Sequence, residues 1–459
     1  MNIIKKLYNS QKHSPDLQIK KITFLNDTIY IINYQSVSSS NNSNDYILNY
    51  LSNRNTFQSI NSLQNDILNN IPSISFIKIK DEDVYYYLFN GFTILIYKNE
   101  ILSFETKNDL DRSISESTSE PSVKGPKDSF NENYNTNIGL IRKRIKDENL
   151  YFDEITLGSK SKTKISIIYM NDIVDKKLLS TVKEKISSIK SDKVFDTYYI
   201  KELIKNENNT LIPTIKSTEK PSVIAKVLTE GKICVLSENS NSILIIPTFF
   251  IDYFYNDEDN YQKKFFVYFV KVIRLLALFI TIFAPSIYLS LITYDEAMLP
   301  TDFLINFSLQ RSGVPFPALI EAFILMITFE LLYEADALTP TTRGTSLSIL
   351  GALVLGDAAV NAGIVSPIMV IVVAITAISS IIFTYQDFQS FIRFYRYLIM
   401  LLSSMFGMIG IFFGFLFLLT NICSINSFGK PFLYPLIIMN NKSLKIQNTE
   451  KRLKWKRYY

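Results

Sequence analysis

The chain has 459 residues, with 48 Lys and Arg against 43 Asp and Glu, so its formal net charge is only +5. Two cysteines and one histidine, His13, argue against a disulfide framework, a His-based zinc site and catalytic triads that use histidine. The length allows two or three domains, and we expect no cofactor and no bound metal.

The two halves of the chain differ in charge. Residues 261–459 carry 16 Lys and Arg against 10 Asp and Glu, whereas residues 1–260 carry 32 against 33. Much of the excess lies in a basic tail, residues 440–459, where Glu450 is the only acidic residue. Such a tail is typical of the cytoplasmic, lipid-facing side of a membrane. Nucleic-acid binding is the weaker alternative, and we expect no nucleic-acid partner.

Residues 1–134 are predicted to form a first small α/β subdomain that ends in a polar linker. Two strands are expected over 17–33 and one or two helices over 46–70, where apolar residues recur at helical spacing. Three β-rich segments follow between residues 75 and 98, including the aromatic run 84–91. The start of the chain has no apolar core of a signal peptide, so we expect no cleaved leader.

Residues 135–260 are predicted to form a second α/β subdomain. We expect helices over 135–146, 175–189 and 221–230, and strands over 163–169, 232–236 and 242–246. Strands that alternate with helices favour a sheet covered by helices. The first 250 residues contain no dinucleotide-binding, phosphate-binding or CxxC motif.

Residues 261–439 are predicted to form an all-α, multi-pass transmembrane bundle of four to six helical segments. Apolar runs occupy 275–292, 314–338, 346–365, 367–386 and 397–421, each close to the length that crosses about 30 Å of hydrocarbon. Five complete crossings from inside would leave the basic tail outside, against the usual charge asymmetry. We therefore expect that 422–439 re-enters or that 314–338 is incomplete or broken, and we favour the latter because Pro315 and Pro317 open this run and three carboxylates lie within it.

Several polar residues fall inside these apolar runs, where a lipid-facing carboxylate is costly. They are Glu321, Glu330, Glu334, Asp357 and Asn361. Asp357 and Asn361 are four residues apart and share a helix face, so they either line a polar pathway or hold helices together by hydrogen bonds. The three glutamates are alternatively explained by ion pairs with Arg311 or Arg343, or by an interfacial location. Aromatic residues at 385, 388, 395 and 397 beside two arginines are typical of an interface belt.

Two ordered sets of motifs carry a family resemblance. The first runs from Arg112 and Glu116 through Glu120, Gly125 and Pro126 to the segment Leu140-Ile-Arg-Lys-Arg144. The second contains Gly313-Val-Pro315-Phe-Pro317, Glu321-Ala, Thr328-Phe-Glu330, Glu334-Ala and Gly363-Ile-Val-Ser-Pro367. Over about residues 80–436 the chain resembles the A subunit of GerA-type spore germinant receptors. It departs from the family pattern at Tyr333 and Asp336, and Asp357 and Asn361 stand where the family usually has Gln and Glu.

The resemblance implies a non-enzymatic signalling subunit in the spore inner membrane, with its N-terminal region and C-terminal tail in the cytoplasm. It also implies a transporter-like B subunit and a lipoprotein C subunit as partners, and self-association into a homo-oligomeric channel for monovalent cations. A secondary transporter and a membrane-anchored scaffold remain as alternatives.

Overall fold

The computed structural model describes residues 2–24, 27–39, 76–97, 100–108, 120, 122–204, 211–338 and 356–434. The chain divides into two compact units, which are treated separately below. The first unit comprises Met1–Asn209 and Thr214–Thr248, and the second comprises Thr210–Pro213 and Phe249–Tyr459. The expected helices over 46–70 and the basic tail lie outside the described residues.

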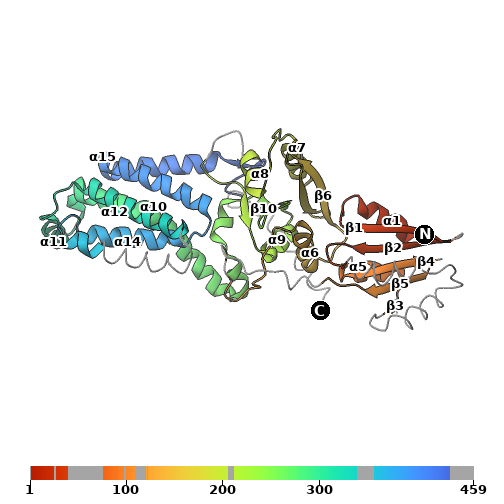
Figure 1. The fold of residues 1–459 in the computed structure, drawn as a ribbon. Helices are drawn as coiled ribbons and strands as arrows, with labels where there is room; N and C mark the ends of the chain where they lie inside the picture. The colour runs from red at the N-terminus through yellow and green to blue at the C-terminus, as the bar shows by residue number, and fades with distance from the viewer. Residues whose placement is uncertain are drawn as a thin grey trace, which may run out of the picture. The chain divides into compact units, whose positions relative to one another are not determined.

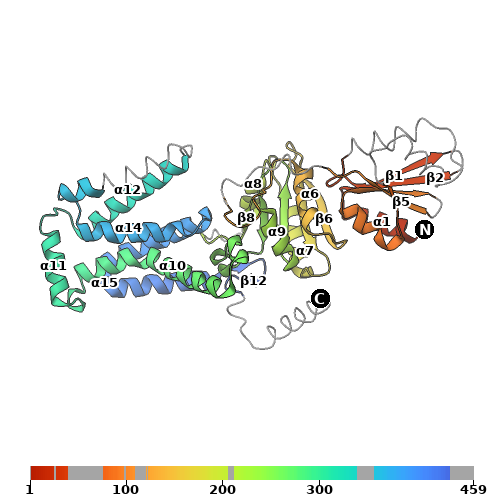
Figure 2. The same ribbon diagram turned by 90° about the horizontal axis from the view of Figure 1, so that it is seen from below.

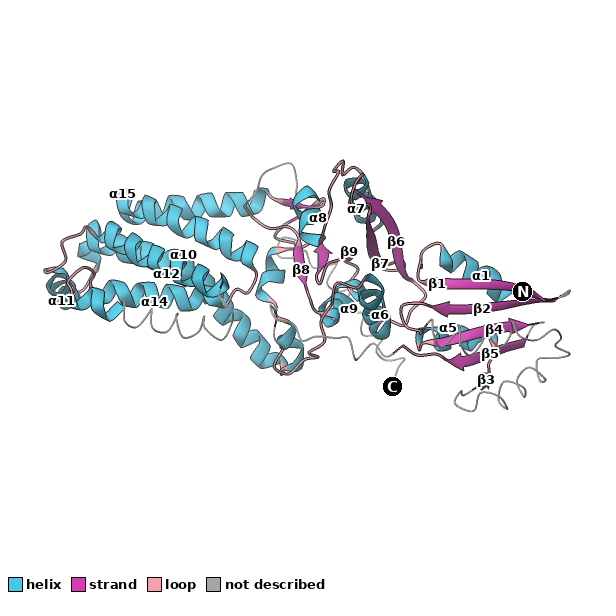
Figure 3. Ribbon diagram, in the orientation of Figure 1, coloured by secondary structure: helices cyan, strands magenta, loops and turns pink. Residues whose placement is uncertain are grey.

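The first unit begins with a five-stranded antiparallel sheet of order β1-β2-β4-β5-β3 (Figures 1 and 3). Its strands are β1 (Leu17–Phe24), β2 (Asp27–Tyr34), β3 (Phe76–Lys78), β4 (Phe92–Tyr97) and β5 (Glu100–Glu105). Helices α1 (Asn2–Gln11) and α5 (Val84–Phe89) contribute Leu7, Val84 and Leu88 to its core. The two strands predicted over 17–33 are therefore confirmed.

The aromatic run 84–91 was predicted to be a strand, and this prediction is wrong. Helix α5 forms there because Val84 and Leu88, one turn apart, are both completely buried against the sheet. Tyr86 points away from the core and is 67% exposed. Packing of the apolar helix face therefore outweighs the preference of tyrosine for strands.

A second five-stranded antiparallel sheet follows, in the order β6-β7-β9-β10-β8. Its strands are β6 (Leu150–Leu157), β7 (Thr163–Met170), β8 (Lys216–Thr218), β9 (Ile233–Ser237) and β10 (Ile243–Ile246). Its helices are α6 (Tyr134–Arg144), α7 (Lys176–Ser187), α8 (Thr197–Ile204) and α9 (Pro221–Thr229). The predicted helices and strands of this subdomain are confirmed to within three residues, whereas β6, β8 and α8 were not predicted.

Residues 122–133, part of the predicted polar linker, are packed against the second sheet. Phe130 is 2% exposed and joins the core beneath α6 and α9. Its backbone N–H donates to the carbonyl of Glu219 at 2.8 Å. The described part of this segment is therefore a component of the second subdomain. Its polar composition predicted a linker, although Phe130 is buried in the core.

The second unit is helical. It contains α10 (Lys264–Thr293), α11 (Thr301–Arg311), α12 (Ala318–Leu338), α14 (Pro367–Ile381) and α15 (Gln386–Ser424), then the short strands β11 (Asn426–Ser427) and β12 (Lys430–Pro431). Within the described residues, α10 and, when its 39 residues are counted as one helix, α15 are long and apolar enough to cross a membrane, and α14 is a shorter apolar helix. Helix α11 lies across the end of the bundle (Figures 1 and 2).

Helix α15 is a hairpin of two arms rather than one straight helix. Gly407 has φ 58° and ψ −139°, which ends the first arm and starts the second. The arms lie side by side, because the rings of Tyr395 and Phe417 are 6.1 Å apart although 22 residues separate them. A Cβ at Gly414 would lie 2.7 Å from Ile399, so the small residues allow close approach. The run 397–421, expected as one crossing, is therefore divided between two arms.

Helix α12 is continuous from Ala318 to Leu338. The break expected within 314–338 is therefore wrong, because Pro315 and Pro317 lie before the first helical residue, where proline costs no helical hydrogen bond. The alternative of an incomplete crossing stays a prediction.

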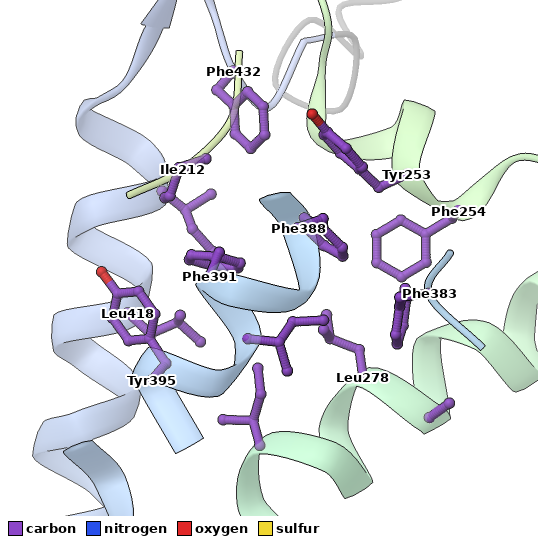
Figure 4. Close-up of a cluster of buried hydrophobic side chains, with 14 of the residues drawn as sticks. Ile212, Tyr253, Phe254, Leu278, Phe383, Phe388, Phe391, Tyr395, Leu418 and Phe432 are labelled. Atoms are coloured by element: carbon purple, nitrogen blue, oxygen red, sulfur yellow. The ribbon is translucent and has the colours of Figure 1, made fainter. Parts of the chain in front are cut away.

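An aromatic cluster closes one end of the second unit (Figure 4). Tyr253 stacks on Phe388 with ring centroids 4.4 Å apart, and Phe432 is 1% exposed beside them. The backbone N–H of Phe250 donates to the carbonyl of Phe432 at 3.0 Å, so Phe250, near the start of this unit, lies beside the last residues of its described part. Phe388 and Tyr395 were predicted to form an interface belt, but they are buried in this cluster and the prediction is wrong.

Candidate functional site

A buried ion pair joins the two sheets of the first unit. Arg142 on α6 is completely buried and donates two hydrogen bonds to Asp16, at 2.7 and 2.8 Å, and a third to Ser14. Its guanidinium lies 4.2 Å from the ring centroid of Tyr34 and 4.7 Å from that of Phe152. Each sheet therefore contributes one aromatic face, and the planar charge is held between them.

Polar contacts at the edge of the interface between the two sheets supplement the Arg142–Asp16 pair. His13, the only histidine, contacts Asp153 at 2.8 Å and stacks on Tyr151. Asp153 also accepts from Tyr169 and Lys183. Burial raises the pKa of Asp153, but these three hydrogen bonds outweigh it, so the pKa lies below its usual value.

A polar cleft of about 400 Å³ lies beside the Arg142 pair, between the two sheets of the first unit. Asp16 and Gln35 line it from the first subdomain, and Glu132, Glu154, Lys164 and Glu238 line it from the second. Asp16 is neutralised by Arg142, so three carboxylates face a single lysine. This arrangement is complementary to a small, positively charged or ammonium-bearing molecule.

The sequence reasoning did not find this cleft. Its carboxylates are far apart in the chain, and Glu154 and Glu238 come together through β7, which pairs with β6 on one side and with β9 on the other. Four residues at the start of α6 also line the cleft, namely Asn133, Tyr134, Asn135 and Ile138. The sequence analysis recognised the motif of this helix but gave it no role. The motif arginines have structural partners: Arg142 binds Asp16, and Arg144 binds Asp128.

The remaining motif positions of the first unit are structural or undescribed. Glu120 accepts hydrogen bonds from the hydroxyl of Thr218 at 2.6 Å and from the backbone N–H of Glu219. Gly125 and Pro126 lie in the loop before Phe130. Arg112 and Glu116 lie outside the described residues.

In the second unit, Glu321 joins two helix N-termini. It is completely buried, and one of its oxygens accepts from the backbone N–H and the hydroxyl of Ser366, the N-cap of α14. The other oxygen lies 3.8 Å from Nε of Arg311. The alternative explanation of an ion pair with Arg311 therefore holds for Glu321. Pro367 occupies the first turn of α14, directly after this cap.

Glu330 on α12 forms ion pairs with two arginines of the first arm of α15. It lies 3.2 Å from Nε of Arg393 and accepts from Nη2 of Arg396. Arg396 is completely buried, and its Nε and Nη1 have no hydrogen-bond partner among the residues described. Neither arginine was the partner expected from the sequence. The cluster thus holds two cations and one anion within an apolar unit.

Glu334, Asp357 and Asn361 are exposed in the second unit. Asn361 donates to Asp357 at 3.1 Å, as their spacing of four residues predicted, and residues 356–361 are helical. The candidate polar positions therefore separate into two groups. Glu321 and Glu330 are used inside the unit, whereas Glu334, Asp357 and Asn361 lie on its surface.

Together, these features define a protein with two antiparallel α/β subdomains and a helical C-terminal unit that contains two membrane-capable helices. The chain belongs to the family described as "Bacillus/Clostridium GerA spore germination protein", whose sequence profile matches residues 3–458. The resemblance inferred from the motifs is thereby confirmed.

Known relatives carry related names. Spore germination protein KA of Bacillus subtilis (strain 168) is 33% identical over 347 residues, which cover 76% of this chain and 64% of that protein. Spore germination protein B1 of the same organism is 33% identical over 362 residues, covering 78% and 74%. Uncharacterized membrane protein YfkQ, also from Bacillus subtilis, is 32% identical and is covered to 63%. This chain therefore spans less than two thirds of the first and third of these relatives.

One solved structure is also similar. The crystal structure of the N-terminal domain of the A subunit of the Bacillus megaterium spore germinant receptor GerK3 aligns with a TM-score of 0.40 and 23% sequence identity. The alignment covers 53% of this chain and 92% of that domain.

Proposed function

We propose that this chain is the A subunit of a spore germinant receptor and acts in nutrient-triggered germination, in the spore inner membrane, beside receptor B and C subunits. Family membership over almost the whole chain carries this proposal. Deletion of the gene should abolish the response of spores to one class of nutrient, and restoring this chain should recover it. Unchanged germination with every tested nutrient would contradict the proposal.

We further propose that the second unit crosses the membrane an even number of times, with both its ends in the cytoplasm. The hydrogen bond between Phe250 and Phe432 supports this, because it brings the entry and exit of the unit together. The two arms of α15 supply the additional crossing that returns the basic tail to the side of Lys263 and Lys264. Single cysteines at Ser312 and Ser404 should be labelled from one side, and Cys423 from the other. Labelling of all three from one side would refute this topology.

We propose that several copies assemble into a channel for monovalent cations. Asp357 supports this, because it is exposed on one copy although it belongs to a membrane unit, and a ring of such carboxylates favours cations. Asp357→Lys should abolish cation flux through reconstituted vesicles while leaving membrane insertion intact. Asp302→Lys, at another exposed acidic position, is the matched control. Equal flux through both variants would exclude Asp357 from the pathway.

Two alternatives make different predictions. A secondary transporter would accumulate substrate in vesicles that contain this subunit alone. A membrane-anchored scaffold would bind the other receptor subunits but conduct no ions in any combination. Flux and accumulation measured on the same vesicles therefore separate the three functions.

The acidic cleft of the first unit supports a second role, which we propose to be binding of a small ammonium-bearing molecule. The excess of three carboxylates over one lysine carries this proposal. Glu154→Gln and Glu238→Gln should each weaken binding of such molecules in calorimetric titration, whereas Glu230→Gln, at the end of α9, should not. Equal affinity in all three variants would rule out the cleft.

A further inference from the structure

Two carboxylates and one tyrosine set the position of α12 along the bundle. Near its start, Glu321 accepts from Ser366 at 2.6 Å. Farther along, Glu330 lies between Arg393 and Arg396, and the hydroxyl of Tyr333 donates to Gln389 at 2.8 Å. All of these contacts are polar, so they define one discrete register of α12 against α14 and α15.

A second carboxylate is placed to replace the first. Glu334 follows Glu330 by four residues, so the two share one face of α12 and differ in position by about one turn, or 5.4 Å. Glu334 is exposed and has no ion pair among the residues described. The opposing arginines are three residues apart and likewise share a face of the first arm of α15.

The arginine cluster is incompletely satisfied in the present register. Nε and Nη1 of Arg396 are buried without a described acceptor, and buried unsatisfied donors of a charged group are costly. Residues 339–355, which follow α12 in the chain, contain no Asp or Glu that could supply another carboxylate. Glu334 is therefore the carboxylate nearest to Glu330 in the sequence that has no ion pair among the residues described.

We propose that α12 has a second register, displaced by one turn along α15, in which Glu334 replaces Glu330 between Arg393 and Arg396. Such one-turn shifts are a known form of two-state switching, because packed interfaces adopt discrete arrangements. The shift breaks the bonds from Glu321 to Ser366 and from Tyr333 to Gln389, so these two contacts favour the present register. Ile327 and Leu331 are exposed, whereas Ala322 and Met326 on the packed face of α12 are completely buried. The shift therefore also moves Glu330 to the position that Met326 now holds.

This inference rests on the proposed function only for its consequence, which is that the shift of α12 would couple nutrient recognition to opening of the proposed channel. Its test is a distance and needs no germination assay. In a Cys423→Ser background, spin labels on Leu331→Cys and Phe394→Cys report the separation of α12 from α15 in the full chain in lipid nanodiscs. Both side chains are exposed, and Cys234 is completely buried.

Ser366→Ala and Tyr333→Phe should each increase a second population whose inter-label distance differs by several ångströms from the main one. Adding Glu334→Gln to either variant should remove that population, whereas adding Glu296→Gln, at an exposed residue outside α12, should not. An unchanged single distance in both loosened variants would overturn the second register. A second population that persists with Glu334→Gln would also overturn it. Neither result depends on whether the chain conducts ions, so this proposal and the channel can fail separately.

Discussion

Removal of one member of the Arg142–Asp16 pair should strongly destabilise the first unit. Both side chains are 1% exposed, and Asp16 also accepts from Ser36. Asp16→Ala leaves a guanidinium that is sealed between two aromatic rings without its counter-ion. Breaking a buried pair in this way costs about 3–5 kcal/mol, and 4 kcal/mol lowers the folded-to-unfolded ratio roughly a thousandfold.

The assay is urea unfolding of a fragment that ends at Thr248, followed by far-ultraviolet circular dichroism and tyrosine fluorescence. Asp16→Ala, Arg142→Met and the double variant complete a double-mutant cycle. The double variant should be more stable than the sum of the single losses predicts, by about 2 kcal/mol or more, because it leaves no unpaired buried charge. Arg144→Met is the control, since its pair with Asp128 is 21% exposed and should contribute about 1 kcal/mol or less.

The reasoning would be refuted if Asp16→Ala lost less than about 1 kcal/mol, or if the two single losses simply added. The first result would mean that water or a rearranged side chain replaces the lost carboxylate. The second would mean that the two residues stabilise the unit independently. Coincident transitions by the two probes are required before either conclusion is drawn.

Three further predictions concern the hairpin, the contacts of Asp153 and the thiols. Gly414→Leu should lower the thermal unfolding midpoint in detergent and reduce the free energy of unfolding by about 1–3 kcal/mol. Gly356→Ala should be nearly neutral, because its Cβ would meet only Val370, at 3.9 Å. Equal effects of the two substitutions would contradict the hairpin packing. The pKa of Asp153 is lowered on folding, so its contribution is present above its unfolded pKa and is lost as the pH falls through the folded value. His13→Asn should therefore shift acid unfolding of the fragment to higher pH, in the range below about pH 4, and an unchanged acid midpoint would count against this contact. Burial raises the pKa of the Cys234 thiol, so a maleimide should label only Cys423 in the native chain and both thiols after denaturation.

Much of the local structure followed directly from the order of the residues. Apolar periodicity predicted α6, α7 and α9 and most strands of the second sheet, because each element buries one face and exposes the other. The motif arginines and the spacing of Asp357 and Asn361 were also visible in the sequence. The partners of these arginines were not, since Asp16 precedes Arg142 by 126 residues.

The sequence by itself determined the division into an α/β part and an apolar helical part, the family, and which polar residues fall within apolar runs. These follow from composition and short-range spacing. Only the tertiary structure decided that the last apolar run reverses at Gly407, that residues 84–89 are helical, and that Glu321 and Glu330 are paired internally. A uniformly apolar run has no periodicity to mark a reversal, and a carboxylate reveals its partner only when distant helices bring the cation to it.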